Sequence, residues 1–308
     1  MINPTLRART TADVDQQIDK VLRGLGNPGP PLDLRVVREL LRLDRSFYNS
    51  EDDGVLRETV SKLKVAGTQI LKRPSILRDV IQKFSLKALY LPDQKRILLD
   101  QAIPQLKHRW SDAHEIGHSV IPWHDGMMLG DDKQTLLPLC HEQMEAEANY
   151  AAGRLLFLGS RFRTEALDHL PTIENVKKLA SRFGNTSTST LWRFVEEAHQ
   201  DRPMFALVSG HPHTTRRTPS FDPTNPCRYY VQSPAFRLKF SGCTEIGLFG
   251  VIASYCGAQR GGTLGKGQII LTDANSASHV FDCETFFNRY DALTLGVWHG
   301  ACSTASFS

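Results

Sequence analysis

Two histidines and a glutamate stand close together in the sequence: His114, Glu115 and His118. On an α-helix, residues four positions apart share one face, so the two imidazoles can bind a single cation. Glu115 would lie about 100° around the helix axis from His114, near enough to act on a water at that cation without binding the cation itself. Two histidine ligands with an adjacent glutamate as general base are typical of zinc-dependent hydrolysis. The spacing therefore predicts Zn²⁺ bound by His114 and His118, with Glu115 as the catalytic residue.

The residues from 104 to 122 have the pattern of a helix that can carry this site. Pro104 suits a first-turn position, where its missing N–H costs nothing, and Pro122 ends the helix after Ile121. Gly117 weakens a helix, which indicates that another part of the chain packs closely there. Apolar side chains give the helix a face to bury, so the histidines need not be core residues: Trp110, Ala113, Ile116 and Val120. The alternative is a solvated or buried helix on which the histidines and glutamate have no chemical role.

A second predicted helix, residues 141–156, offers a third ligand. Catalytic zinc needs three protein ligands and an open position. Glu145 and Asn149 share one face of this helix, so we expect Glu145 to complete the metal site and Asn149 to orient a ligand histidine from behind. The same helix contains one rival ligand, His141, and two glutamates that are expected to face solvent, Glu142 and Glu147.

The paired motifs resemble those of the ImmA/IrrE metallopeptidase family, in which an AHELGH helix precedes a helix with the pattern E-x-x-A-N-x-F-A-x-x-L-L. Ala151 stands where the family has phenylalanine, a departure that concerns packing and leaves the metal ligands unchanged. The resemblance covers roughly residues 30 to 200 and leaves 201–308 largely unexplained. The matching positions are Ala113 to His118, Glu145, Ala148, Asn149, Leu155 and Leu156.

This resemblance implies an α+β protein with two parts. The first is a mainly helical, zincin-like metallopeptidase domain with a small β-sheet, and the second is a smaller α+β sensor-like domain, often of GAF type in the family. The resemblance also implies a zinc endopeptidase that cleaves a helix-turn-helix transcriptional repressor and so derepresses genes for stress response or phage defence. The C-terminal domain would gate the cleavage in response to DNA damage or a ligand.

Three further residues near the two helices are candidates for roles at the site. Cys140 comes shortly before Glu145, so its thiolate could bind zinc at the open position and inhibit the enzyme. An inert, buried cysteine is the alternative. The donor that stabilises the oxyanion is not assigned by the sequence, and Tyr150 and His124 are the candidates. His124 lies in a predicted loop, where a surface position is the ordinary expectation.

The composition of the chain and its apolar runs predict the cellular compartment and the state of the cysteines. The 308 residues carry a net charge of +4, which is too small to indicate nucleic-acid binding by itself. The N-terminus lacks a signal-peptide pattern, and no run approaches the ~20 apolar residues of a membrane span, so we expect a cytoplasmic protein without a membrane partner. The six cysteines include no CxxC pair, and buried thiols are expected rather than a redox or metal site.

Pro-rich and Gly-rich segments suggest four parts: a leader at 1–30 with one short helix at 12–25, a peptidase domain at 31–200, a linker at 201–226 and a sensor-like domain at 227–308. In the peptidase domain we expect strands at 87–91 and 96–100, helices at 33–44, 54–71 and 75–84, and a helix-turn-helix-like unit at 171–198. In the sensor-like domain we expect strands at 228–240, 248–256 and 268–271, and a helix near 283–293.

A second hypothesis is a DNA-binding transcriptional regulator whose zinc site is structural or vestigial. Arg35, Arg38 and Arg42 form a stripe that could follow a phosphate backbone, although a solvated helix face is the more economical explanation. The second helix of the 171–198 unit presents Thr188, Ser189, Thr190 and Arg193, a weak set for reading bases. Single- or double-stranded DNA that activates the peptidase would combine the two hypotheses.

Overall fold

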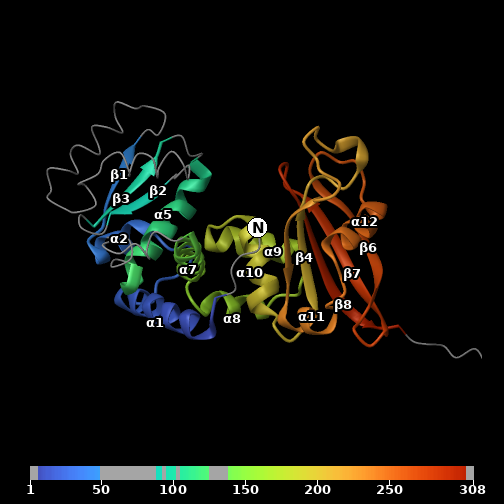
Figure 1. The fold of residues 1–308 in the computed structure, drawn as a ribbon, viewed down its shortest axis with the longest axis horizontal. Helices are drawn as coiled ribbons and strands as arrows, with labels where there is room; N and C mark the ends of the chain where they lie inside the picture. The colour runs from blue at the N-terminus through green and yellow to red at the C-terminus, as the bar shows by residue number, and fades with distance from the viewer. Residues whose placement is uncertain (1–5, 49–87, 92–94, 102–104, 125–137, 303–308) are drawn as a thin grey trace, which may run out of the picture. The chain divides into compact units, whose positions relative to one another are not determined.

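A computed structural model describes residues 6–48, 88–91, 95–101, 105–124 and 138–302 (Figure 1). The helices expected at 54–71 and 75–84 lie outside these ranges. The chain divides into two compact units, Met1–Ser160 and Arg161–Ser308. Both contain helices together with a sheet, which agrees with an α+β fold. None of the helices in the described ranges is both long and apolar enough to cross a membrane.

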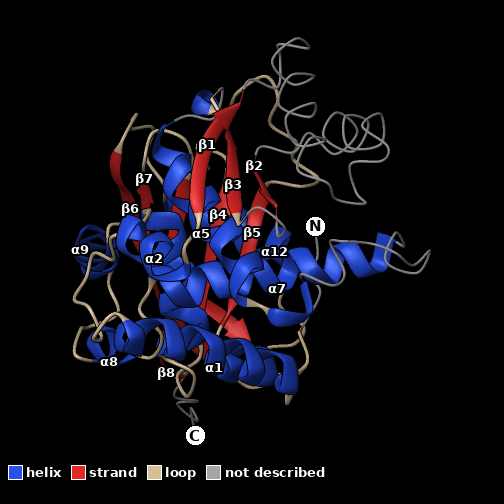
Figure 2. Cartoon of the chain, turned by 90° about the vertical axis from the view of Figure 1, so that its left-hand side faces the viewer, coloured by secondary structure: helices blue, strands red, loops and turns tan. Residues whose placement is uncertain are grey.

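The first unit combines a small sheet with a group of helices. The sheet has the strand order β1-β3-β2, with β1 parallel and β2 antiparallel to β3 (Figure 2). The two strands expected before the histidine helix are confirmed as β2 and β3. Helix α5 carries His114 and His118, and it packs on the sheet and on α7. The elements are α1 (Ala8–Gly24), α2 (Leu34–Leu41), β1 (Asp44–Tyr48), β2 (Ala88–Leu91), β3 (Arg96–Asp100), α5 (Gln105–Val120) and α7 (Pro138–Leu156).

Helix α1 confirms the short helix expected at 12–25, but it is part of the first unit's core, so the prediction of a separate leader at residues 1–30 is wrong. Val14 and Ile18 are fully buried, and α1 packs against α7. Asp15 joins the two helices, because it accepts a hydrogen bond from the Tyr150 hydroxyl at 3.1 Å and pairs with Arg154 at 2.7 Å. A polar surface on α1 concealed its narrow apolar stripe from sequence reasoning.

The arginine stripe on α2 is only partly a solvated face. Asp33 caps the helix by accepting the backbone N–H of Arg35, whose side chain is exposed. Arg38 is buried and forms an ion pair with the buried carboxylate of Asp112 on α5, which also pairs with Arg45 at 3.3 Å. Arg38 therefore fastens α2 to the histidine helix and is not available to a phosphate backbone.

The second unit is built on a five-stranded antiparallel sheet with the order β5-β4-β8-β7-β6. One of its inner strands, β4, Met204–Ser209, is buried along its whole length. The linker predicted at 201–226 and the boundary predicted after residue 200 are therefore wrong. The elements are α8 (Arg161–Leu167), α9 (Ile173–Phe183), α10 (Ser187–Arg193), a π-helical turn (Phe194–Ala198), β4 (Met204–Ser209), a 3₁₀ turn (Thr214–Arg216), β5 (Cys227–Gln232), α11 (Pro234–Lys239), α12 (Glu245–Tyr255), β6 (Gly262–Thr272), β7 (Ser278–Phe287) and β8 (Ala292–Ala301).

Two predictions for the C-terminal region are wrong. The expected strand at 248–256 lies within α12, which begins after Thr244, whose hydroxyl accepts the backbone N–H of Gly247. This N-cap is the local signal that the apolar run concealed. The expected helix at 283–293 is instead the hairpin between β7 and β8, where the side chain of Asn288 accepts the backbone N–H groups of Tyr290 and Asp291. The strand expected at 228–240 is β5 only as far as Gln232, and its second half is wrong because Pro234–Lys239 form helix α11. The strand expected at 268–271 lies within β6.

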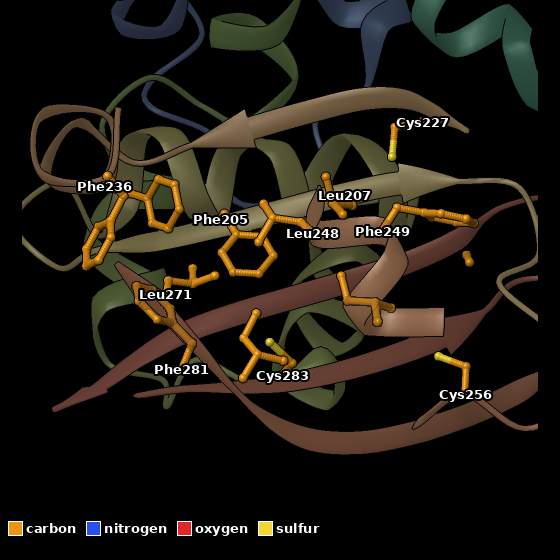
Figure 3. Close-up of a cluster of buried hydrophobic side chains, with 14 of the residues drawn as sticks. Phe205, Leu207, Cys227, Phe236, Leu248, Phe249, Cys256, Leu271, Phe281 and Cys283 are labelled. Carbon is orange, nitrogen blue, oxygen red and sulfur yellow. The ribbon is translucent and has the colours of Figure 1, made fainter. Parts of the chain in front are cut away.

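Aromatic rings dominate the core between this sheet and helices α11 and α12 (Figure 3). Phe236 from α11 lies 5.4 Å from Phe205 and 5.5 Å from Phe281, measured between ring centroids. Phe240 stacks on Phe236 at 5.0 Å. Since Phe205 belongs to β4 and Phe281 to β7, these contacts join strands from the beginning and the end of the second unit's chain segment. The second unit thus has a hydrophobic core of its own.

Helices α9 and α10 confirm the two helices expected in the 171–198 unit, but they belong to the second unit. Gly184 ends α9 with a φ of 67°, and Thr186 caps α10. Both helices pack on the sheet, α9 on β7 and α10 on β4 and β8. Thr190, which the sequence places on an exposed face, is fully buried. This packing leaves α10 as a support for the sheet.

Candidate metal centre

Helices α5 and α7 approach each other closely at Gly117. A Cβ atom on this residue would lie 2.8 Å from the carbonyl oxygen of Ala148 and 3.3 Å from the Cβ of Ala151. Real Cβ atoms do not approach a backbone oxygen so closely, so the helix contact requires glycine. The close packing that the sequence indicates at Gly117 is present, and it brings the histidines within reach of the polar residues of α7.

Three ligand atoms converge between the two helices. The Nε2 atoms of His114 and His118 are 3.2 Å apart. The carboxylate of Glu145 lies 3.2 Å from Nε2 of His114 and 3.5 Å from Nε2 of His118. With zinc–nitrogen bonds of about 2.0–2.1 Å at a tetrahedral angle, two ligand nitrogens would lie roughly 3.3–3.4 Å apart. The observed separation fits a zinc ion, and within the described parts of the chain these three residues are the one His/Cys/Asp/Glu group that could hold a metal.

In both His114 and His118, the ring nitrogen that faces away from the cluster, Nδ1, has a hydrogen-bond partner. Nδ1 of His114 lies 3.1 Å from Oδ1 of Asn149, and the amide oxygen can only accept, so the imidazole donates this hydrogen bond. When His114 is neutral, the proton on Nδ1 leaves Nε2 without one, which is the form that binds a metal. Asn149 therefore lies where the sequence expects it, behind a ligand histidine.

The electrostatics of the cluster suit a bound cation. Burial disfavours the imidazolium and lowers the pKa of His118 to about 4, so this side chain is neutral at pH 7. Burial opposes the ionisation of Glu145, but its close approach to both histidines outweighs this effect and lowers the pKa of the carboxyl. Burial also acts against a charged His114, yet Glu145 and Glu115 raise its pKa above the ordinary value. The site thus favours a positive charge next to an ionised Glu145.

Glu115 is buried beside the ligands, with 4% of its surface exposed. Burial raises the pKa of its carboxyl to about 7, against the opposing charge of His114. The carboxylate also accepts a hydrogen bond from the backbone of Tyr90, a residue of β2. The small sheet therefore holds the side chain beside the metal ligands. A carboxyl with a pKa near neutrality can both take up and release a proton at physiological pH.

Comparison with known families agrees with this geometry. Residues 65–194 match the family model of peptidase M78, described as the IrrE N-terminal-like domain. The match covers both helices of the metal centre and less than half of the chain, and it supports the resemblance to the ImmA/IrrE family. No curated protein matches the chain significantly. Among solved structures, a Mycobacterium tuberculosis transcriptional regulator is similar over 93% of this chain and 76% of its own, with 12% sequence identity and a TM-score of 0.49.

Two residues behind this IrrE-like centre differ from the sequence expectation. His124 is completely buried instead of lying on the surface, and Glu147 is 2% exposed instead of solvated. The helix pattern contained a signal for Glu147, because it falls at i+3 from Met144 and i−4 from Ala151, both buried. His124 follows Pro122 in a short helical turn, and no local pattern distinguishes it from a loop histidine.

The remaining candidate residues from the sequence lie away from the three converging ligand atoms or outside the described side chains. Glu142 is exposed, as expected. The Tyr150 hydroxyl is directed to Asp15 on α1, so the structure gives no support for Tyr150 as the oxyanion donor. Cys140 and His141 lie in the first turn of α7, and their side chains are outside the described part of the structure. The inhibitory thiolate and the rival ligand therefore stay predictions.

Proposed function

We propose that the protein is a zinc-dependent endopeptidase. The observation that carries this proposal is the convergence of His114, His118 and Glu145 between two helices, with the buried Glu115 next to His114 in the same helix. Two histidines and a glutamate are the protein ligands of one known type of catalytic zinc site. The match of residues 65–194 to the M78 peptidase family supports the same conclusion.

The residues of the site have three tasks in peptide hydrolysis: binding the metal, transferring a proton and orienting a ligand. His114, His118 and Glu145 would hold Zn²⁺, which lowers the pKa of water towards about 7 and polarises the scissile carbonyl. The Glu115 carboxylate takes the proton of the attacking water and delivers it to the nitrogen of the leaving amine. Asn149 keeps His114 oriented through the hydrogen bond to Nδ1.

The substrate and its control follow from the resemblance to the ImmA/IrrE family. We expect a helix-turn-helix repressor as the substrate, with stress-response or phage-defence genes derepressed by its cleavage. The second unit, with an antiparallel sheet and helices packed on it, would act as a sensor-like domain that gates cleavage in response to DNA damage, bound DNA or a ligand. Its own hydrophobic core supports an independently folded domain.

The Glu115→Gln substitution tests the proposal directly. Glutamine keeps the size of the side chain but cannot accept the proton, so cleavage is expected to fall by about 10²–10⁴-fold. The measurement is cleavage of a candidate helix-turn-helix repressor from the same genome, after co-expression and with purified proteins. Glu142→Gln on the exposed face of α7 is the matched control and should cleave like the wild type. Undiminished cleavage by a zinc-bound Glu115→Gln variant would falsify the general-base role.

The DNA-binding alternative has weaker support in the structure. The helix pair α9–α10 is present, but Thr190 and Leu191 are buried and the Arg193 guanidinium pairs with Glu197. Little of α10 is left to read a base sequence. Salt-sensitive binding to DNA, combined with no chelator-sensitive cleavage of the repressor, would favour this alternative over the peptidase.

A further inference from the structure

Another buried histidine, His124, lies directly behind His118, one of the candidate metal ligands. Nδ1 of His124 is 2.9 Å from Nδ1 of His118, and the Nε2 atom of His124 is 2.9 Å from Oε2 of Glu147. The three residues are 0–3% exposed, so water does not compete for these contacts. They form a continuous chain of hydrogen bonds that runs from a carboxylate on α7, through the turn after α5, to the candidate metal ligand.

The proton positions in this series of hydrogen bonds can be assigned by starting from the carboxylate of Glu147. A carboxylate has only acceptor atoms, so His124 must donate from Nε2 to Glu147. With that proton placed, the Nδ1 of a neutral His124 is an acceptor, and Nδ1 of His118 must donate to it. Nε2 of His118 is then without a proton and turned towards Nε2 of His114 and the carboxylate of Glu145. A doubly protonated His124 would reverse the bond and put a proton on the metal-binding nitrogen.

Glu147 is fixed at the end of the chain by two further donors. Trp123 donates its indole N–H to Oε2 at 2.6 Å, and Gln143 donates its side-chain amide to Oε1 at 2.8 Å. A buried carboxylate without such partners would be costly, so these contacts are what allow Glu147 to remain charged inside the unit. Its charge in turn stabilises the proton on Nε2 of His124.

The structure assigns His124 and Glu147 as positioning residues that fix the proton arrangement and ring orientation of His118 so that its Nε2 binds the metal. Outer partners of this kind hold a ligand imidazole in the binding form and typically contribute about 10–100-fold to metal affinity. The assignment rests on the zinc site of the proposed function and does not depend on peptidase activity. It also distinguishes the two ligands, because His114 is supported by the neutral amide of Asn149 and His118 by a histidine backed by a carboxylate.

Two substitutions at position 124 separate this role from simple filling of space. His124→Asn places an amide oxygen near the position of Nδ1 and can still accept from His118, whereas His124→Leu fills the space with no acceptor. We expect zinc affinity, measured by competition with a chromogenic chelator, to fall about 10–100-fold for His124→Leu and to be largely restored by His124→Asn. Glu147→Gln should weaken zinc binding as well, and the exposed Glu142→Gln should not.

A spectroscopic readout tests the proton arrangement itself. Long-range ¹H–¹⁵N spectra of the metal-free full chain should show the His118 proton on Nδ1 in the wild type and in His124→Asn, and should show this preference lost in His124→Leu. Thermal unfolding of each metal-free variant identifies a general loss of stability. Equal zinc affinity in the leucine and asparagine variants, close to that of the wild type, would overturn the positioning role. A wild-type protein that binds no zinc would instead overturn the proposed function and this inference with it.

Discussion

The two units bury chemically reactive side chains in opposite ways. In the first unit, buried histidines and glutamates contact one another, and three ligand atoms converge between α5 and α7. In the second unit, Cys227, Cys256 and Cys283 are buried among phenylalanine and leucine side chains. Burial raises the pKa of Cys227 and of Cys283 to about 12. One unit holds polar groups ready to share a cation, and the other keeps the thiols of Cys227 and Cys283 protonated.

This difference shows that burial of reactive residues does not by itself indicate a site. The decisive property is whether donor atoms point at one another with their remaining hydrogen-bonding atoms satisfied. His114 and His118 meet this condition, because Asn149 and His124 occupy their opposite nitrogens. The cysteines of the second unit do not form a metal cluster within the described residues. Hydrophobic packing is a sufficient explanation for them.

The largest expected effect on this contrast between the units comes from removing one candidate metal ligand. Without its carboxylate, Glu145→Ala leaves two histidine ligands, so zinc affinity should fall by more than about 100-fold, beyond the loss of an outer partner. Cys256→Ala in the second unit should leave zinc stoichiometry unchanged. Metal analysis of both purified full-length variants gives the answer. Retention of zinc by Glu145→Ala, or its loss from Cys256→Ala, would place the metal elsewhere.

Two helical glycines should respond to alanine with opposite signs. Gly117→Ala in α5 forces a Cβ towards the Ala148 backbone, so the α5–α7 region should be destabilised by about 1–3 kcal/mol. Gly250 in α12 is exposed, and a Cβ atom there would have nothing within 4 Å, so alanine should stabilise the helix by up to about 1 kcal/mol. Hydrogen exchange followed by mass spectrometry on peptides from α7 and α12 measures each effect locally. Equal signs would contradict the close approach at Gly117.

The smallest expected effect is the reactivity of the second unit's thiols. Since burial raises the pKa of Cys227 and Cys283 to about 12, both stay protonated at mildly alkaline pH and should react slowly with iodoacetamide. In the unfolded chain these thiols ionise at lower pH, so the folded state should lose stability as the pH rises above about 9. Peptide mapping should show Cys302, which is only partly buried, labelled earlier. Rapid native labelling of Cys283 would reopen the question of a redox site.

Local spacing in the sequence determined the candidate ligands and the elements that carry them. The four-residue interval of His114 and His118, and that of Glu145 and Asn149, each place two side chains on one helix face, whatever the rest of the fold does. The strands at 88–91 and 96–100 and helix α9 were predictable for the same reason: periodicity and capping act over a few residues. The wrong prediction of a strand at 248–256 falls where an apolar run has no clear period.

Only the tertiary structure decided how these elements combine. The contact of α5 with α7 at Gly117 brings Glu145 to the two histidines, and the same packing buries His124 against Glu147, which the sequence places on the surface. The structure also shows α1 as part of the first unit and β4 as an inner strand of the second sheet. The physical reason is that burial and long-range hydrogen bonds depend on residues distant in the chain. Short-range patterns specify a ligand's helix face, and only packing specifies what lies behind it.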